Sequence, residues 1–461
     1  MIQFFSINDF TRYIALFVIL VLIRSFFWAL YPEPFLIEIH YQNIVEQLNR
    51  LGESYVNVLH QIGPLSAGLF RYVYGGVGES VFLARLIALL VCYIQVLVVT
   101  VGINNVNGLR ENNSFFGVIH IVLLHLFPDM LVLSPLLMGM TVLSITYVML
   151  FSIIRDRTND GSYLFVGVLQ SLAVVILFPL FIFTIPTLLV IVFYTRFNPK
   201  FIGLYLLGLV LPMTIVFSYY FFNNYASEYF TINFFYGFSI RFISQVPFTY
   251  YFIIGFVPIV LFTISFFKVL AMYNMVNYQQ KMIVTGTFFL VAALVIFFLL
   301  PDKSPFFFFL FIPFAIHFFG ILFIESRYEK MDRLAFLCFF LMLGIPLLTK
   351  IDKISTLFTT NELLPKEVIP SYGRVLNLSD DKNVLANNHY ATGFCDFMIA
   401  RNFFLDKTPE SSILVYNTLE KDLPDAIYDP NHIVASKFKS LPMLAEKYKY
   451  FSHLTLYRRK I

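Results

Sequence analysis

The residues that could do chemistry in this sequence are few, and several gather in one place. The stretch EPFLIEIHYQNIVEQLNRLGESY carries four carboxylates, Glu33, Glu38, Glu46 and Glu53, against one base, Arg50. It directly follows a hydrophobic span. A carboxylate at a lipid boundary can hold its proton more tightly than in water, which would suit it to general base catalysis. The alternative is a set of solvated carboxylates that keep one face of a surface helix wet.

Arginine side chains offer a second kind of chemistry, the bidentate binding of phosphate oxygens. Arg24 and Arg85 lie inside apolar segments. An unpaired charge there costs at least about 2.5 kcal/mol, so we expect both to have partners. Snorkelling of these side chains toward the lipid headgroups is the alternative to ligand binding, and Glu79 could equally neutralise Arg85 within the fold. Further basic candidates, in segments expected on the external side of the membrane, are Arg71, Arg241 and Lys303.

One more acid stands out, Asp129 in the stretch LFPDMLVLSP. It could serve as a second acid or as a ligand of a divalent cation, or it is a plain residue at a solvated turn. The spacing of the cysteines and histidines predicts no metal site, because Cys92, Cys338 and Cys395 are far apart and His120 and His125 do not share a helix face. No phosphate loop or nucleophile elbow is present in the sequence.

The elements that must position these residues follow from composition. Of the 461 residues, 59% are apolar and 13% charged, so a soluble fold would lack polar side chains to cover its surface. We therefore expect a membrane protein whose solvent is lipid. The net charge of +4 is too small to indicate nucleic-acid binding. The last 111 residues hold 27 of the 60 charged residues, which predicts a transmembrane domain at 1–350 and a soluble domain at 351–461.

Hydrophobic runs of about 20 residues predict the membrane-spanning helices. Two longer runs are each expected to form a helical hairpin, 114–154 with its tip at Pro128-Asp129 and 162–195 with its tip at Pro179 and Pro186. The run at 282–324 is likewise expected to form two spans around PDKSP. Single spans are predicted near 11–31, 79–103, 200–221, 250–272 and 333–349, which gives a polytopic, mainly α protein with about eleven spans.

Orientation follows from the lysines and arginines of short loops, which favour the cytoplasm. Placing the N-terminus inside puts eleven such residues on the cytoplasmic side against four outside. With an odd number of spans the C-terminal domain lies outside. In a bacterium this predicts a multi-pass protein of the inner membrane with a periplasmic C-terminal domain.

The loop at 32–78 is then external and contains two expected surface helices. In Leu36–Leu51 the apolar residues recur at intervals of three and four, which predicts an amphipathic helix along the membrane surface. Its apolar face has Ile37, Tyr41, Ile44, Leu48 and Leu51, and its polar face has Glu38, Gln42, Glu46 and Arg50. The segment GPLSAGLFRYVYGGVG at 63–78 predicts a second short interfacial helix that begins at Pro64.

This layout resembles the GT-C superfamily of membrane glycosyltransferases, which take a sugar from a polyprenyl-phosphate donor. The resemblance rests on the acidic first external loop, on the segment PLSAGLFRYVYGGVGESVFLARLIALL, on Asp129 in the second external loop and on the soluble tail. It implies that Glu38 is the catalytic base and that Asp129 faces the same external cavity. It also implies that His40 and Tyr41 contact the substrate and that the outer basic residues bind the donor phosphate. These basic residues are Arg24, Arg71, Arg85, Arg241 and Lys303.

Alternatives to an enzyme stay open. Members of that superfamily frequently have paired acids in the first loop, whereas LIEIHYQN has Glu38 alone. The chain is also similar to uncharacterised bacterial membrane proteins that share IGPLSA after an acidic surface helix, here Ile62–Ala67, and PDAIYDP at 424–430. A noncatalytic component of a cell-envelope assembly, with the tail as docking domain, is therefore the second hypothesis. A transporter is the third, although no internal repeat with broken helices is present in the sequence.

The tail itself is expected to form a small α/β domain. Strands are predicted at 375–379, 425–429 and 454–459, and helices near 395–405, 411–420 and 434–447. No glycine fingerprint for a nucleotide is present. Asp380, Asp381 and Asp429 are expected to be turn and strand-end residues.

Overall fold

The computed structural model describes most of the helical region and part of the C-terminal region. The longer described stretches are 2–5, 9–31, 62–75, 81–106, 113–126, 128–155, 159–194, 197–230, 248–270, 276–300, 305–324, 426–429, 432–452 and 456–460. Shorter ones are 38, 41–42, 44–45, 48–49, 108, 233, 337, 341, 344, 375–377, 412, 415–416 and 423–424. The span predicted at 333–349 and the tail helix predicted near 395–405 therefore lie almost entirely outside the described residues.

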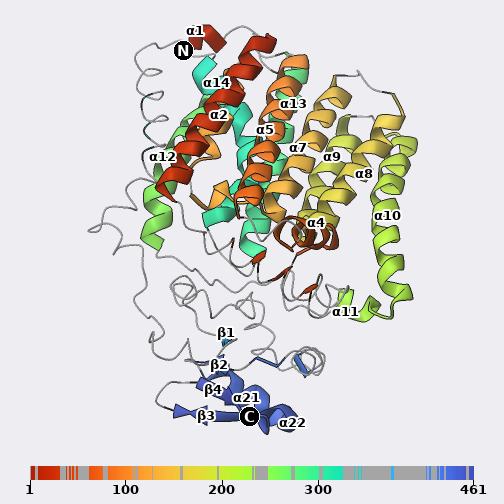
Figure 1. The fold of residues 1–461 in the computed structure, drawn as a ribbon. Coiled ribbons are helices and arrows are strands. Elements are labelled where there is room, and N and C mark those ends of the chain that lie inside the picture. The colour runs from red at the N-terminus through yellow and green to blue at the C-terminus, as the bar shows by residue number, and fades with distance from the viewer. Residues whose placement is uncertain are drawn as a thin grey trace.

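The described chain is mainly helical, and its helices stand side by side in a bundle (Figure 1). Five helices are long and apolar enough to cross a bilayer, among the residues that the structure describes. They are α2 (Phe10–Leu30), α5 (Val81–Asn105), α7 (Pro135–Ile154), α10 (Pro199–Phe222) and α13 (Asn277–Leu299). α12 (Phe248–Leu270) is a further apolar helix, and the described part of the bundle also has the short helices α1 (Ile2–Phe5), α4 (Pro64–Gly75) and α11 (Ala226–Phe230).

Three helix breaks interrupt the long hydrophobic runs near the predicted positions. The first run forms α6 (Phe115–Leu123), the 3-10 turn η2 (Pro128–Leu131) and α7. The second forms α8 (Gly161–Ile176), η3 (Phe178–Phe183) and α9 (Thr184–Tyr194), and the third forms α13, η5 (Pro305–Leu310) and α14 (Ile312–Ile324). Proline lacks an N–H and cannot continue the ladder of a preceding helix, which is why Pro128 and Pro179 lie in the breaks. Pro186 does not, because it occupies the first turn of α9, where no N–H is needed.

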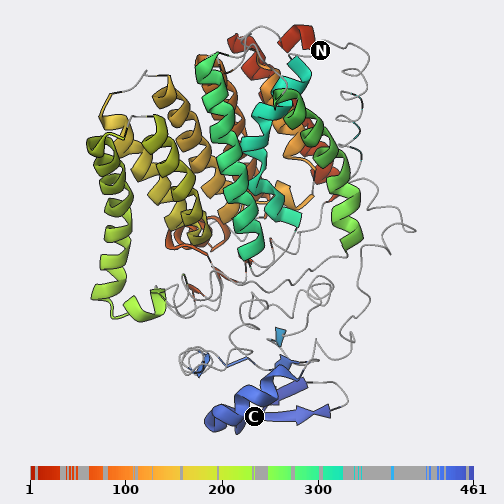
Figure 2. The same ribbon diagram turned by 180° about the vertical axis from the view of Figure 1, so that it is seen from behind.

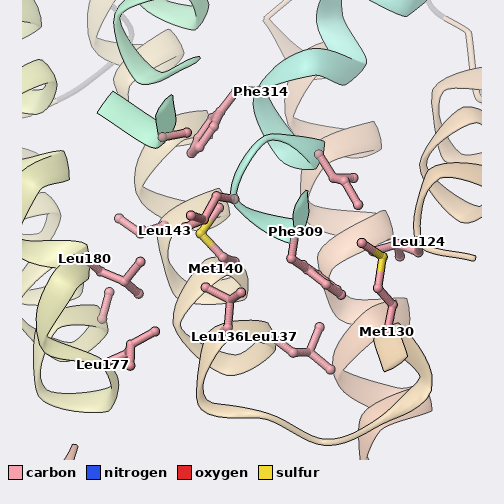
Figure 3. Packing of buried hydrophobic residues seen from close by; sticks show 14 of the residues in the cluster. Leu124, Met130, Leu136, Leu137, Met140, Leu143, Leu177, Leu180, Phe309 and Phe314 are labelled. Carbon is pink, nitrogen blue, oxygen red and sulfur yellow. The ribbon is translucent and has the colours of Figure 1, made fainter. Parts of the chain in front are cut away.

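The bundle core is built from aliphatic and aromatic side chains of α7, η3, α13 and α14. Leu143, Leu180 and Phe314 converge there from separate elements (Figure 3). The ring of Tyr147 lies 5.2 Å from that of Phe289 and 5.1 Å from that of Phe314, measured between centroids. These contacts hold the broken helices against the continuous ones.

Two glycines allow α8 and α10 to pack backbone against backbone. A Cβ atom on Gly167 would lie 2.2 Å from the carbonyl oxygen of Tyr205, and one on Gly208 would lie 2.1 Å from that of Leu164. No side chain fits at either position. Close approach through small residues is the usual way for membrane helices to associate, because lipid provides no hydrophobic drive.

Polar contacts tie the helix ends together at one end of the bundle, which we call the basic end. Arg155 Nη1 donates to the carbonyl oxygen of Asn105 at 3.3 Å, and the Arg155 guanidinium lies over the ring of Tyr278. Lys200 forms an ion pair with Asp160. The lysines and arginines described at this end are Arg12, Arg155, Lys200, Lys268 and Lys281.

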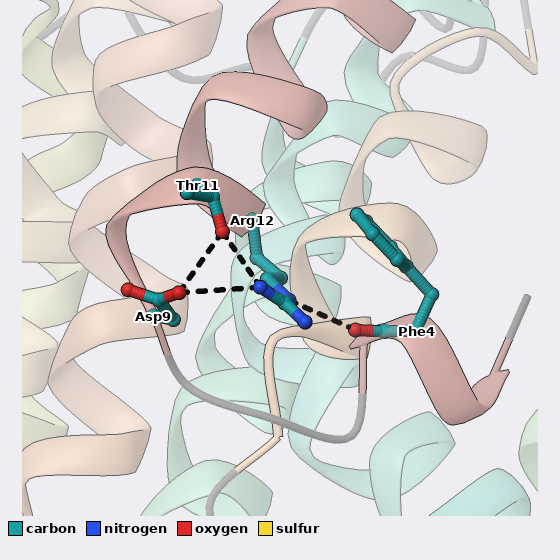
Figure 4. A network of polar contacts seen from close by, with 4 residues as sticks. All are labelled: Phe4, Asp9, Thr11 and Arg12. Atoms are coloured by element: carbon teal, nitrogen blue, oxygen red, sulfur yellow. Dashed lines mark hydrogen bonds and ion pairs between the residues drawn. The ribbon is translucent and has the colours of Figure 1, made fainter.

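The start of α2 belongs to the same end (Figure 1), and its polar contacts are drawn in Figure 4. Arg12 donates through Nε to the carbonyl oxygen of Phe4 at 3.1 Å and through Nη1 to Asp9 Oδ2 at 3.2 Å. Thr11 also donates its hydroxyl to Asp9 at 3.0 Å. These bonds anchor the short α1 against the first turn of α2.

The opposite end of the bundle holds α4 and α11, and we call it the α4 end (Figures 1 and 2). The C-terminal sheet lies beyond this end in both views. Its strand order is β1-β2-β4-β3, with β1 (Val375–Asn377) parallel to β2 (Ala426–Tyr428). β4 (Leu456–Arg459) runs antiparallel to β2 and to β3 (Tyr448–Phe451).

The tail has strands at the three predicted segments and one additional strand, β3. Strands were expected at the sites of β1, β2 and β4, whereas β3 was not foreseen. The helix predicted at 434–447 is divided into α21 (Ile433–Ser440) and α22 (Pro442–Ala445) because Pro442 cannot continue α21. Asp429 caps α21 as a strand-end residue should, since its two oxygens accept from the N–H groups of Ile433 and Val434 at 2.9 and 2.7 Å.

Candidate functional site

A buried ion pair lies at the α4 end of the bundle. Arg85 Nε donates to Glu38 Oε1 and Arg85 Nη2 donates to Glu38 Oε2, each at 2.8 Å. The remaining terminal nitrogen, Nη1, donates to the carbonyl oxygen of Tyr31 at 3.1 Å. Glu38 is fully buried and Arg85 is 5% exposed. The geometry is the parallel, two-bond fork that gives arginine its specificity for carboxylates and phosphates.

The pair corrects one expectation from the sequence. Glu38 was placed on the wet face of the first-loop helix, but it is buried on the same side as Tyr41, Val45 and Leu48. A charge at that position is tolerated because Arg85 neutralises it and satisfies both oxygens. Glu79, the partner considered for Arg85, lies outside the described residues.

Three aromatic side chains pack together in this region, and one of them, Tyr74, lies near the charges of Glu38 and Arg85. The ring of Tyr41 lies 4.6 Å from that of Phe70, and Phe70 lies 5.6 Å from Tyr74, between centroids. Phe70 and Tyr74 come from α4, one helical turn apart. The Tyr74 hydroxyl is buried and has no hydrogen-bond partner among the described residues. Burial raises the pKa of Tyr74, and the negative charge of Glu38 raises it further, so the phenol stays protonated and can donate.

The segment Ile62–Ala67 fixes α4 in this place. Gly63 N–H donates to the carbonyl oxygen of Ile176 at 3.0 Å, and the Ser66 hydroxyl donates to the same oxygen at 2.8 Å. The last carbonyls of a helix lack partners within the helix, and α8 ends at Ile176. A Cβ atom on Gly63 would lie 1.9 Å from the carbonyl oxygen of Val175, so only glycine fits. The IGPLSA stretch is thus the cap of α8 and the anchor of α4.

A second buried arginine lies deeper in the bundle. Arg24 Nη1 donates to the carbonyl oxygen of Leu131 at 2.9 Å, and Nη2 donates to Cys92 Sγ at 2.8 Å and to the carbonyl oxygen of Met130 at 3.3 Å. Arg24 has no exposed surface. Snorkelling toward the headgroups is therefore wrong for this residue. The hydrogen bonds that it makes are to neutral groups of α5 and of η2.

The two arginines are related by the register of the antiparallel pair α2 and α5. Arg24 of α2 meets Cys92 of α5, and seven residues further along α2 the carbonyl of Tyr31 meets Arg85, seven residues back along α5. Seven residues of α-helix rise about 10 Å. The Arg24 contacts and the Glu38–Arg85 pair therefore occupy one side of the α2–α5 contact, about two helical turns apart.

The other predicted site residues are placed only in part. The backbone of Asp129 lies in η2, one residue before Met130, and its side chain lies outside the described part of the structure. Arg71 is exposed on α4, and its Nε donates to Asn49 Oδ1 at 3.0 Å. Tyr41 is buried, and its ring packs against that of Phe70. The remaining predicted residues, His40, Arg241 and Lys303, lie outside the described residues, as do Glu33, Glu46 and Glu53.

Several features of this region had no signal in the sequence analysis. Pairing of Glu38 with Arg85 spans 47 positions, and the Arg24 contacts with η2 span more than 100. Cys92 is a buried neighbour of Arg24. Among the described residues no group of three histidine, cysteine, aspartate or glutamate side chains could hold a metal ion.

The site can do two things chemically. A guanidinium fork can bind a phosphate as well as a carboxylate, since both present paired oxygens, and a phosphate bound to Arg85 would displace the Glu38 carboxylate. Glu38 would then be free to accept a proton. Without such an exchange, both oxygens stay occupied and the pair is a structural connection between the first loop and α5.

Comparison with known proteins adds no assignment: no family model matches this chain, and no curated protein matches it in sequence. The fold and composition therefore carry the classification. Several helices in the described part of the chain are apolar and long enough to cross a bilayer, which is compatible with a multi-pass α-helical membrane protein, and the chain also has a small C-terminal sheet.

Proposed function

We propose that this chain is a membrane glycosyltransferase of GT-C-like architecture that takes a sugar from a polyprenyl-phosphate donor. The Glu38–Arg85 pair carries the proposal, because it joins an acid of the first loop to a guanidinium of α5, a group able to bind phosphate oxygens, in a buried position. A carboxylate and a guanidinium are the groups that such a transfer needs, the first for the acceptor hydroxyl and the second for the leaving phosphate.

In this mechanism the donor phosphate replaces the Glu38 carboxylate on Arg85. The released carboxylate takes the proton of the acceptor hydroxyl while the acceptor oxygen forms a bond to the anomeric carbon. The bond between that carbon and the phosphate oxygen breaks, and the polyprenyl phosphate leaves with the electron pair beside Arg85. Asp129 is the proposed second acid of the site, and Arg71, Arg241, Lys303, His40 and Tyr41 are proposed substrate contacts. Addition of a divalent cation to the assay tests whether a metal ion acts beside the phosphate.

The proposal includes a location. The described lysines and arginines of the basic end support a cytoplasmic basic end and an external α4 end, by the preference of basic loops for the cytoplasm. In a bacterium the site then faces the periplasm from the inner membrane, with about eleven spans at 1–350, the surface loop at 32–78 and a soluble domain at 351–461.

The alternative is a noncatalytic component of a cell-envelope assembly, with the C-terminal domain as its docking part. One observation favours it: both oxygens of Glu38 are already bound by Arg85, as in a purely structural ion pair. Glu38 would then stabilise the fold without reacting.

Transfer of radiolabelled sugar from a polyprenyl-phosphate donor to membrane acceptors tests the proposal. The purified protein is compared with Glu38→Gln and Asp129→Asn, with and without added Mg²⁺ or Mn²⁺. We expect each variant to lose at least a hundredfold in rate. The matched control is Asp160→Asn, which removes an exposed carboxylate at the basic end and should leave the rate unchanged.

Two results would overturn the enzyme hypothesis. Absence of transfer by the wild type with every donor tested would remove it, and full activity of both variants would remove the roles of Glu38 and Asp129. Stable co-purification of envelope proteins through residues 351–461, with no bound polyprenyl lipid, would support the alternative.

A further inference from the structure

The turn η2 breaks the hydrophobic run between α6 and α7 inside the bundle. A break of this kind leaves backbone carbonyls without helical partners, and in a buried position each needs another donor. Met130 and Leu131 are both buried in this turn. Asp129, the proposed second acid, is the residue just before them.

Arg24 supplies the missing donors to this turn. Its two terminal nitrogens donate to the carbonyl oxygens of Leu131 and Met130 at 2.9 and 3.3 Å. These are adjacent residues, so one planar guanidinium holds two successive peptide units. A lysine ammonium is a single point and cannot match that fork.

The guanidinium also contacts α5, and the next turn of α2 packs against the segment before η2. Cys92 of α5 accepts from Nη2 at 2.8 Å. One turn along α2, the Phe27 ring stacks on the His125 ring with centroids 5.8 Å apart, and His125 lies between α6 and η2. Arg24 of α2 therefore contacts both α5 and η2, and Phe27 packs the same part of α2 against the segment that precedes η2.

We propose that Arg24 is a positioning residue that sets the place of the Asp129 turn, in contrast to the phosphate contact that the sequence suggests for it. The described hydrogen bonds of its terminal nitrogens point to the protein backbone and to Cys92. Its effect on the reaction rests on the proposed function, through Asp129, whereas its hold on the turn does not.

A buried reporter on η2 tests the hold directly. Met130 has no exposed surface and its side chain lies beside Leu124 (Figure 3). Met130→Cys is introduced in a background with Cys92, Cys338 and Cys395 each replaced by serine, which keeps an acceptor for Arg24 at position 92. The rate of reaction of the purified protein with a water-soluble maleimide is then measured in detergent.

We expect Arg24→Gln to raise the labelling rate of the Met130→Cys reporter at least tenfold. Arg24→Lys should give a rate between those of Arg24 and Arg24→Gln. The matched control is Leu20→Ala, one turn away on the same buried face of α2, which should raise the rate less than twofold. A second reporter, Val190→Cys, is buried on α9 and should stay protected in all variants.

Two labelling results would overturn the positioning role. One is an unchanged rate at the Met130→Cys reporter in Arg24→Gln. The other is an equal rise at both reporters, or an equal rise in Leu20→Ala, since each indicates a general loosening of the bundle.

The transfer assay adds a second measurement, the separate changes in kcat and in KM, which a loss of packing alone would not separate in this way. Arg24→Gln should lower kcat at least tenfold with KM for the donor changed less than twofold, and Arg24→Lys should restore part of kcat. A rise in KM with kcat unchanged would indicate that Arg24 contacts the donor phosphate, and it would overturn the proposal. If the wild type has no transferase activity, the proposed function fails while the labelling result still decides the role of Arg24.

Discussion

The guanidinium of Arg85 and the carboxylate of Glu38 face each other as a fork, with both nitrogen–oxygen distances at 2.8 Å and almost no exposed surface on either side chain. One residue comes from the first loop and the other from the second turn of α5. The pair is therefore a cross-link between the loop and the bundle, whatever chemistry it also performs.

Removing one partner of this pair should be costly. Glu38→Gln leaves the Arg85 charge buried, and we expect the free energy of unfolding to fall by about 3–5 kcal/mol. Replacing both residues by Met should recover most of that loss, because no charge is then left buried. SDS titration of the purified protein measures both values. The exposed pair of Asp160 and Lys200 is the control, and Asp160→Asn should change stability by less than about 1 kcal/mol.

Full stability of the single variant Glu38→Gln would contradict this prediction. It would mean that Arg85 finds another acceptor at no cost, so that the pair is not needed to hold the first loop.

The hydroxyl of Tyr74 should contribute little to stability by itself. It is buried, stays protonated because burial and Glu38 raise its pKa, and has no hydrogen-bond partner among the described residues. Tyr74→Phe should therefore leave the free energy of unfolding within about 0.5 kcal/mol of wild type or raise it. Tyr74→Ala, which also removes the ring packed on Phe70, should lower it by about 3–5 kcal/mol. A loss above about 1 kcal/mol in Tyr74→Phe would indicate that the hydroxyl has a bound partner.

Much of the helical layout could be predicted because it depends on local quantities. The length of a hydrophobic run and the position of its prolines are enough to place the breaks at η2 and η3, and Pro64 and the glycines after Tyr74 are enough to place α4. A bilayer has a fixed thickness, so a run that is too long must turn.

The site could be predicted only as a set of residue types. Periodicity assigns Glu38 to the solvent-exposed face of its helix because it counts a carboxylate as polar. It contains no information on Arg85, the distant residue that neutralises Glu38. The contact of Ser66 with Ile176 joins residues 110 positions apart, so no local pattern indicates it. β3 was missed for a similar reason, since YKYF forms a strand through its pairing with β4.

Gly63 should tolerate no side chain, whereas Gly68 should. Gly63→Ala would place Cβ 1.9 Å from the carbonyl oxygen of Val175, and the N–H bond to Ile176 would be displaced. We expect a loss of about 1–3 kcal/mol in stability from this overpacking. Gly68 lies in α4, the helix that follows Gly63, with nothing within 4 Å of a Cβ, so Gly68→Ala should be neutral or stabilising by up to about 1 kcal/mol.

The measurement for these two variants is SDS titration of each purified protein. Equal stabilities would show that α4 can shift away from the end of α8, and the IGPLSA segment would then not be its anchor.

The contact of α8 with α10 allows the same comparison within one helix. Gly208→Ala would bring Cβ to 2.1 Å from the carbonyl oxygen of Leu164, and backbone atoms cannot move aside without separating the two helices. We expect stability to fall by about 2 kcal/mol or more. Gly203→Ala is the matched control, because a Cβ at Gly203 meets nothing within 4 Å. Thermal unfolding in detergent, followed by circular dichroism, should show a lower midpoint for Gly208→Ala alone. A midpoint lowered equally by both variants would mean that the helix tolerates alanine poorly as such, and the close crossing of α8 and α10 would not explain the loss.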